Sequence, residues 1–129
     1  MYNNEAYRQL IASLNTEDVS YALLRDDLAS EHPIKDLDIL LDKKQVDHFH
    51  CLAAKHGFYL IKDGYLNPGK RVYLKVEEGR PYILDVHESI VYQGIEFLDS
   101  GRVLKRRRMQ SGFYRLTTED FLLSLLFHN

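Results

Sequence analysis

Two aspartates, Asp36 and Asp38, stand one residue apart within an apolar run at residues 34–41. A third aspartate, Asp85, lies in a second apolar run at residues 82–87. Side chains alternate between the two faces of a β-strand, so Asp36 and Asp38 project from the same face. If the two runs form neighbouring strands, about 5 Å apart, Asp85 can join them on that face.

Three carboxylates at this spacing repel one another unless a cation lies between them. Ligand sets made only of oxygen atoms suit Mg²⁺ or Mn²⁺. The pattern therefore predicts a metal site formed by Asp36, Asp38 and Asp85, of the kind that assists phosphoryl or nucleotidyl transfer. The alternative is an exposed strand end with ordinary solvated carboxylates, and the residue pattern leaves both interpretations open.

The elements that must position these aspartates follow from hydrophobic periodicity and turn residues. We expect helices at 4–14, 42–57 and from 117, strands at 21–25, 34–41, 58–62, 71–76 and 81–87, and a hairpin of 95–98 with 103–109. The short turns between the later strands argue against a purely parallel sheet. We therefore expect one domain over residues 1–129, of the α/β (α+β) class. Its mixed central sheet should carry helices mainly on one face and the carboxylates on the other. The alternative for domain organisation is that the chain is the N-terminal part of a longer protein.

Composition limits the classes of protein to consider. The 129 residues are 45% hydrophobic and 28% charged, which is ordinary for a globular domain, and the net charge of −2 argues against a nucleic-acid partner. Cys51 is the only cysteine, so the chain has no internal disulfide. It has no apolar stretch near the roughly 20 residues of a membrane span and no signal-peptide start. We expect a cytoplasmic protein without a membrane partner.

Several other residues are further candidates for the site. Arg71, Tyr73 and Lys75 alternate onto one strand face, where we expect them to flank the carboxylates. His87 shares a strand face with Asp85 and either reaches a substrate phosphate or bonds to a neighbouring loop. The basic run 105–108 is expected in an edge strand, where alternation divides its charges between the two faces. We interpret these charges as solvent-exposed groups that protect the edge of the sheet from aggregation.

The order of these segments carries a resemblance to a known group of proteins. Leu24-Arg25, Asp36-Leu37-Asp38 and Leu84-Asp85-Val86-His87 follow one another at the spacing of the nucleotidyltransferase fold superfamily, which includes the polymerase-beta-like enzymes. The usual signature has Gly with Gly or Ser, about ten residues, an Asp-apolar-Asp pair and a later acidic residue. The chain resembles a less characterised branch that carries Leu-Arg in place of Gly-Ser, over residues 20 to 126.

This resemblance implies that Asp36 and Asp38 bind Mg²⁺ or Mn²⁺, with Asp85 as a further ligand or as the group that takes a proton. The implied reaction moves a nucleoside monophosphate from a nucleoside triphosphate to a hydroxyl acceptor. Arg25 either grips a phosphate, with His87 as a second cofactor-binding candidate, or forms a structural ion pair that closes the site. The rival function is a non-catalytic nucleotide- or partner-binding domain that retains the fold. The acceptor, the base and the oligomeric state stay open.

Overall fold

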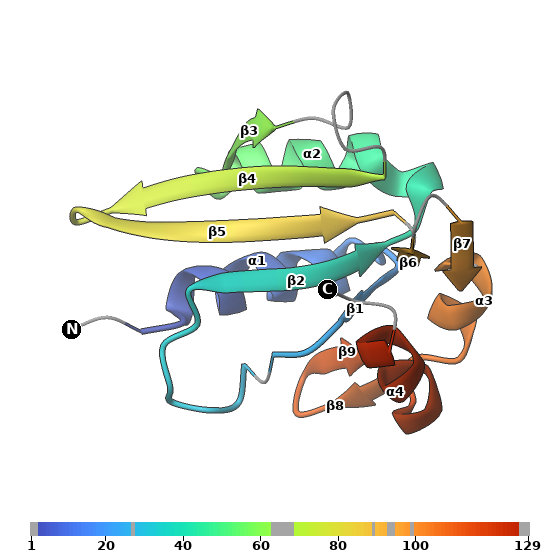
Figure 1. The fold of residues 1–129 in the computed structure, drawn as a ribbon. Helices are drawn as coiled ribbons and strands as arrows, with labels where there is room; N and C mark the ends of the chain where they lie inside the picture. The colour runs from blue at the N-terminus through green and yellow to red at the C-terminus, as the bar shows by residue number, and fades with distance from the viewer. Residues whose placement is uncertain are drawn as a thin grey trace.

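A seven-stranded mixed sheet forms the centre of the molecule in a computed structural model that describes residues 3–26, 28–62, 69–88, 90–92, 95–98 and 100–126 (Figure 1). Its strand order is β3-β4-β5-β2-β1-β9-β8, and β6 and β7 form a separate two-stranded sheet. The helices, in chain order, are α1 (Glu5–Thr16), the 3₁₀ turn η1 (Lys43–Gln45), α2 (Val46–Lys55), α3 (Ser100–Lys105) and α4 (Thr118–Leu126). The strands are β1 (Tyr21–Leu23), β2 (Asp36–Leu41), β3 (Tyr59–Lys62), β4 (Lys70–Glu77), β5 (Arg80–His87), β6 (Ile90–Tyr92), β7 (Ile95–Leu98), β8 (Arg108–Gln110) and β9 (Phe113–Arg115).

Strand directions confirm that the sheet is mixed. β2 runs parallel to β5, and β1 runs parallel to β9. The pairs β1–β2, β3–β4, β4–β5 and β8–β9 are antiparallel. The predicted α/β class with a mixed sheet is therefore correct.

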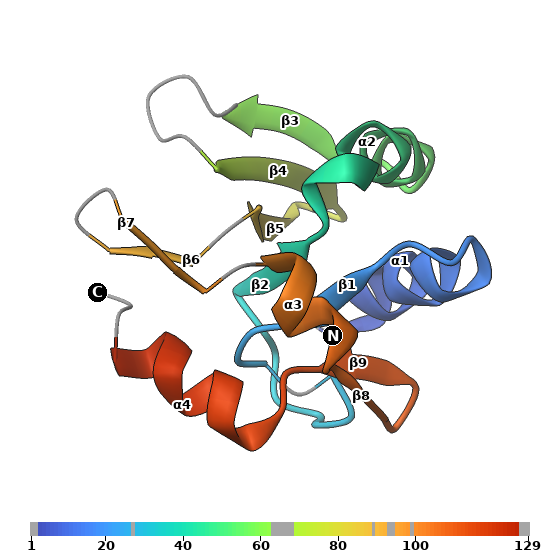
Figure 2. The ribbon, with the colours of Figure 1, turned by 90° about the vertical axis from the view of Figure 1, so that its right-hand side faces the viewer.

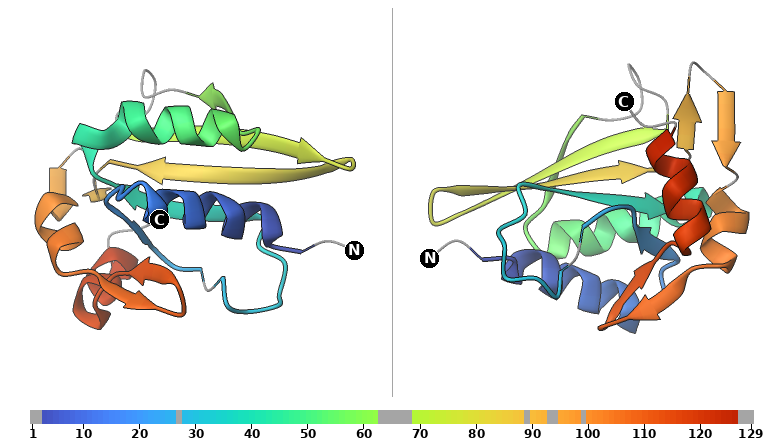
Figure 3. Two further views of the ribbon diagram at one scale, coloured as in Figure 1. Left: turned by 180° about the vertical axis from the view of Figure 1, so that it is seen from behind. Right: turned by 60° about the horizontal axis from the view of Figure 1, so that its bottom comes forward.

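Helices α1 and α2 cover one face of the sheet (Figures 2 and 3). Leu37 and Ile39 of β2 point into this layer and are fully buried. Because neighbouring strand residues point to opposite faces, Asp36 and Asp38 must project from the face away from α1 and α2. The main core consists of apolar side chains from these helices and strands, including Leu10, Ile11, Leu14, Phe49, Phe58, Tyr73, Leu84 and Val86.

The opposite face carries a smaller apolar cluster at one end of β2. Leu40 packs there with Val103 and Leu104 of α3, together with Ala22, Leu24 and Leu116. Figure 2 shows α4 on this same side of the sheet. The two longest helices, α1 and α2, thus lie on one face, whereas α3 and α4 lie on the other, and among the described residues the apolar cluster of the carboxylate face lies at its Leu40 end.

The predicted hairpin of 95–98 with 103–109 is wrong. Ile95–Leu98 pairs with Ile90–Tyr92, and the following residues form helix α3. Val103 and Leu104 are only 1% and 3% exposed. Consecutive strand residues would point to opposite faces, whereas a helix can turn both toward the same apolar cluster. Residue 99, in the predicted turn, lies outside the described residues.

The basic run 105–108 is also not a continuous strand. Lys105 ends α3, and only Arg108 belongs to the edge strand β8. Arg106 bonds to Asp120 in α4 through two hydrogen bonds, with nitrogen–oxygen distances of 2.9 and 3.1 Å. Arg107 lies over the ring of Tyr114, 4.0 Å from its centroid. These contacts give two of the four charges a structural role.

A side-chain cap marks the start of helix α4, which was predicted to begin at about residue 117. The backbone N–H of Asp120 donates to the Thr117 hydroxyl, which in turn donates to the Asp120 carboxylate. Phe121 packs against the smaller apolar cluster, whereas Leu122 is 55% exposed. Within the described ranges, no helix is both long enough and apolar enough to cross a membrane.

Candidate functional site

The parallel pairing of β2 with β5 places two of the three aspartates side by side. Asp38 is the direct register partner of Asp85, and Leu40 is the partner of His87. Asp36 lies two residues before Asp38 on the same face and is exposed. The side chains of Asp38 and Asp85 are only 16% and 14% exposed. The structure therefore brings the three predicted residues together on one open face of the sheet.

A tight turn determines which residues of β4 join this face. Glu78 and Gly79 have φ angles of 53° and 77°, as a two-residue hairpin with a type I′ turn requires. Counting back from this turn pairs Val72 with Asp85 and Lys70 with His87. Lys70 therefore belongs to the carboxylate face.

The expectation that Arg71, Tyr73 and Lys75 flank the carboxylates is wrong for the same reason. Tyr73 is fully buried in the main core under α2, where its hydroxyl contacts His50. Arg71 pairs with Glu88, with a nitrogen–oxygen distance of 3.3 Å. The hairpin register thus turns these side chains toward the helices, and the even-numbered residues of β4 face the aspartates.

Asp38 is surrounded by three polar partners from two segments, the end of β5 and the residues after β1. Its Oδ1 lies 3.2 Å from Nε2 of His87, and its Oδ2 lies 3.9 Å from Nε of Arg25. Its backbone N–H donates to the carboxylate of Asp26 at 3.3 Å. Asp38 is therefore the centre of the cluster, and both cofactor-binding candidates predicted from the sequence touch it.

Asp85 has its own cationic neighbour. Nζ of Lys70 lies 3.8 Å from its Oδ1. Burial raises the pKa of the Asp85 carboxyl, the negative charges of Asp38 and Asp36 raise it further, and Lys70 opposes them. Burial likewise raises the pKa of Asp26, with the same two aspartates adding to the effect. The cluster is crowded with negative charge.

The donor set fits a hard divalent cation. Unit charges of the same sign about 5 Å apart repel by about 3 kcal/mol at an effective dielectric constant of about 20. Carboxylate oxygens from Asp36, Asp38 and Asp85 are the ligands that Mg²⁺ and Mn²⁺ prefer. In the described part of the chain, however, no three Asp, Glu, His or Cys side chains are already arranged as a metal site. Arg25 and His87 contact Asp38 instead, and Lys70 contacts Asp85, so a bound ion requires these three side chains to turn away.

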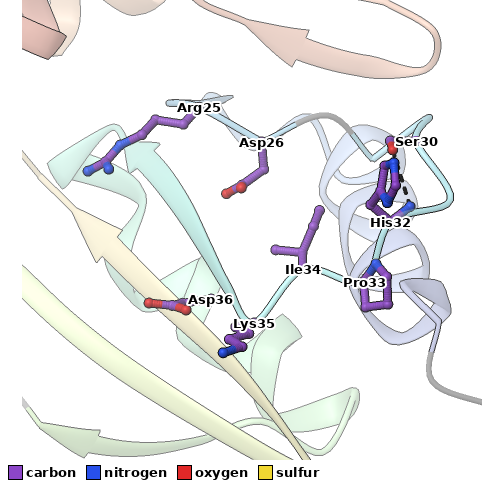
Figure 4. A pocket seen from close by; sticks show the side chains of 8 residues that line it. All are labelled: Arg25, Asp26, Ser30, His32, Pro33, Ile34, Lys35 and Asp36. Carbon is purple, nitrogen blue, oxygen red and sulfur yellow. Dashed lines mark hydrogen bonds between the residues drawn. The ribbon is translucent and has the colours of Figure 1, made fainter.

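A cavity of about 430 Å³ adjoins Asp36 (Figure 4). Its wall is formed by the segment between β1 and β2, and its lining residues are Arg25, Asp26, Ser30, His32, Pro33, Ile34, Lys35 and Asp36. In Figure 4, Asp26 and Asp36 lie on opposite sides of the opening, and Arg25 lies at one end. The cavity therefore borders the carboxylate cluster at Asp26 and Asp36.

Helix α1 holds the segment that forms this cavity. The buried Asn4 side chain donates to the carbonyl of His32 at 2.8 Å and accepts from the backbone N–H of Ile34 at 2.9 Å. Arg8 donates to the carbonyls of Leu28 and Ser30. These bonds anchor a segment without regular secondary structure to a rigid helix.

Sequence reasoning missed Asp26 and Lys70 as members of the cluster. Asp26 directly follows Arg25, and its carboxylate reaches the backbone of β2. Lys70 could have been found by counting residues back from the turn at Glu78 and Gly79, because a two-residue hairpin determines which residues are opposite each other. Residue 27, the next aspartate, lies outside the described residues.

Comparisons with known proteins place the fold. No known sequence family matches the chain, and no curated protein does either. Among solved structures, the chain is similar to a crystal structure described as a "putative nucleotidyltransferase" from Thermotoga maritima, with a TM-score of 0.58 and 14% sequence identity. The match covers 98% of this chain and 86% of that one. The fold is nucleotidyltransferase-like. This confirms the fold predicted from the order of the acidic motifs, while the Leu24-Arg25 departure stays an observation of this sequence alone.

Proposed function

We propose that the face formed by Asp36, Asp38 and Asp85 transfers a nucleoside monophosphate from a nucleoside triphosphate to a hydroxyl acceptor, with Mg²⁺ or Mn²⁺ as the metal. One observation carries this proposal. Asp38 and Asp85 are direct register partners in parallel strands, with Asp36 on the same face, within a nucleotidyltransferase-like fold. Such an arrangement stabilises the fold poorly and suits a metal-bound polyphosphate well.

The three aspartates would hold the metal through their carboxylate oxygens. A bound divalent ion would neutralise phosphate charge and lower the pKa of the acceptor hydroxyl. The acceptor oxygen attacks the α-phosphorus, the bond to the β-phosphate oxygen breaks, and pyrophosphate leaves. Asp85, the register partner of Asp38, would be the third of these ligands or, alternatively, the group that takes the proton of the acceptor hydroxyl.

Arg25 and His87 would act on the phosphates and on Asp38. The guanidinium of Arg25 lies at the edge of the cavity, where it can donate two parallel hydrogen bonds to a phosphate. His87 keeps Nε2 against Asp38 and so orients that carboxylate. The adjoining cavity falls within the usual range of about 300–1,000 Å³ for small-molecule sites and gives room for a small acceptor or the nucleoside.

A second function is a non-catalytic domain that binds a nucleotide or a partner protein. The observation that favours it is the pairing of Asp38 with both Arg25 and His87, together with the absence of Gly-Ser at Leu24-Arg25. If these ion pairs are permanent, the carboxylates are satisfied without a metal. The site then keeps its shape but has no catalytic activity.

Thermal unfolding with ATP, CTP, GTP or UTP, each with and without Mg²⁺, tests the two functions. A ligand that binds only the native state raises the melting temperature, and the rise grows with the ratio of ligand concentration to Kd. The enzyme predicts a metal-dependent rise for at least one nucleotide, together with a labelled product when the protein is incubated with α-labelled triphosphate and cell extract. Asp38→Asn should abolish both. A metal-independent rise without product supports the binding domain, and product formation by Asp38→Asn contradicts the catalytic proposal.

A further inference from the structure

Two long cationic side chains approach the carboxylate cluster from opposite sides. Arg25 extends from the segment after β1 to Asp38, and Lys70 extends from the start of β4 to Asp85. β1 and β4 flank the β2–β5 pair that carries the aspartates. Each of the two central carboxylates therefore has one cation that comes from outside the pair.

These contacts are close enough for attraction but too long for strong hydrogen bonds. The nitrogen–oxygen distances are 3.9 Å for Arg25 and 3.8 Å for Lys70, whereas charge-assisted bonds are about 2.7–2.9 Å long. Both cationic side chains are about one-third exposed, at 35% and 34%, while their carboxylate partners are largely covered. The cations can therefore swing away while the carboxylates stay in place on the sheet.

The position of Lys70 on β4 also places it beside His87. It is the cross-strand partner of His87, so the two side chains stand next to each other on the carboxylate face. His87 in turn contacts Asp38. An anion bound by Lys70 would thus lie beside the aspartates and would not be turned toward the helices.

Resting on the proposed function, we propose that Arg25 and Lys70 are exchangeable counter-ions that couple metal binding to polyphosphate binding. Without ligands, they neutralise Asp38 and Asp85. A divalent cation displaces them from the carboxylates, and the released guanidinium and ammonium groups bind the phosphates of the nucleotide. Lys70 is thereby a polyphosphate-binding residue of this site.

The coupling follows from charge. Metal alone must separate two ion pairs, and polyphosphate alone meets four carboxylates, those of Asp26, Asp36, Asp38 and Asp85. When both ligands are bound, the metal neutralises the carboxylates, and the phosphates neutralise the released side chains of Arg25 and Lys70. Such coupling is reciprocal and typically amounts to about 5–150-fold in affinity.

Isothermal titration with Mn²⁺ alone, and with pyrophosphate at saturating Mn²⁺, tests this proposal in the Lys70→Gln variant. Removing the ammonium group should strengthen the binding of Mn²⁺ alone by about tenfold and weaken pyrophosphate binding by about tenfold. Chelation of Mn²⁺ by pyrophosphate in solution is the same for every variant, so it cancels in the ratio. Lys70→Arg, which keeps the charge, should restore both affinities toward those of the original chain.

Arg71→Gln is the matched control. It removes one positive charge from the next residue of the same strand, but Arg71 pairs with Glu88 and not with the cluster. Neither affinity should change in this variant. The far-ultraviolet circular dichroism of each variant establishes that it is folded.

Changes of opposite sign in Lys70→Gln, and no change in Arg71→Gln, support the proposal. Unchanged pyrophosphate binding in Lys70→Gln overturns it, because Lys70 is then only a structural partner of Asp85. Unchanged Mn²⁺ binding in that variant overturns it as well, because the ammonium group then does not compete with the metal. Failure of the proposed function has a separate signature, which is full Mn²⁺ affinity in Asp38→Asn.

Discussion

Replacing Asp85 by Asn should stabilise the protein in the absence of metal. The carboxylate is largely buried beside Asp38, and its raised pKa shows that its environment disfavours the charge. Asn has nearly the same shape and carries no charge. If Asp85 serves to bind metal and does not stabilise the fold, removing its charge should increase the free energy of unfolding.

The magnitude follows from the neighbours of Asp85. Repulsion from Asp38 is worth about 3 kcal/mol for unit charges about 5 Å apart at an effective dielectric constant of about 20. The substitution also gives up the attraction of Lys70, which is worth about 1 kcal/mol because that side chain is partly exposed. We expect a net gain of about 1–2 kcal/mol, or a rise of about 4–8 °C in the melting temperature of a domain of this size.

The assay is thermal unfolding in EDTA at pH 7, repeated at lower pH. A carboxyl whose pKa is higher in the folded state contributes stability that is present at low pH and lost as the pH rises through the folded pKa. The advantage of Asp85→Asn should therefore be large at pH 7 and disappear below about pH 4, where Asp85 is protonated in both states. With saturating Mg²⁺, the original chain should gain stability and the variant should not.

Asp120→Asn is the matched control for this prediction. Asp120 is also buried, but its carboxylate accepts hydrogen bonds from Arg106 and from Thr117 at the start of α4. The same chemical change should therefore lower stability, by about 0.3–1 kcal/mol for the loss of a negative charge in the first turn of α4. A fall in melting temperature for Asp85→Asn comparable to that of Asp120→Asn would refute the reasoning, since Asp85 would then be a structural partner of Lys70.

Three further predictions test the account of the fold. Tyr7→Phe removes the hydroxyl that accepts from the backbone N–H of Ile83 at 2.9 Å, so urea unfolding should show a loss of about 1–3 kcal/mol; a loss below 0.5 kcal/mol would contradict this bond. Leu104→Ala should cost about 2–4 kcal/mol in the same assay if α3 buries that side chain, and almost nothing if the segment were an exposed strand. Burial raises the pKa of Tyr21 and of Tyr73, so stability should hold up to about pH 10 and fall above it, and unfolding that is independent of pH from 8 to 11 would disagree.

Much of the site could be predicted because strand alternation is a local property. Asp36 and Asp38 flank Leu37, and the burial of Leu37 in the core is enough to turn both carboxylates to the opposite face. Asp85 and His87 flank Val86 in the same way. The three aspartates therefore followed from the pattern once their strands were taken as neighbours.

The partners of these aspartates depend on register, which alternation does not determine. No short turn joins β2 to β5, so the alignment of Asp38 with Asp85 could be known only from the structure. The β4–β5 register does follow from a two-residue turn, because counting back from Glu78 and Gly79 places Lys70, and not Arg71, on the carboxylate face.

Helix α3 shows a different limit. Its six residues are too few for a helical period to be evident, and two adjacent apolar residues, Val103 and Leu104, are compatible with a strand. The apolar cluster around Leu40, distant in the sequence, favours the helix because it can bury both. Tertiary packing therefore determines that this segment is a helix, whereas its local sequence is compatible with a helix or a strand.

The central claim is that Asp36, Asp38 and Asp85 form a metal-binding face for a polyphosphate. Anomalous diffraction from crystals soaked with Mn²⁺ and pyrophosphate tests it most directly. The account predicts an anomalous peak coordinated by carboxylate oxygens of Asp38 and Asp85, with Lys70 and Arg25 turned onto the pyrophosphate. Crystals that show no manganese at these carboxylates, with both cations still on them at saturating Mn²⁺, would contradict it.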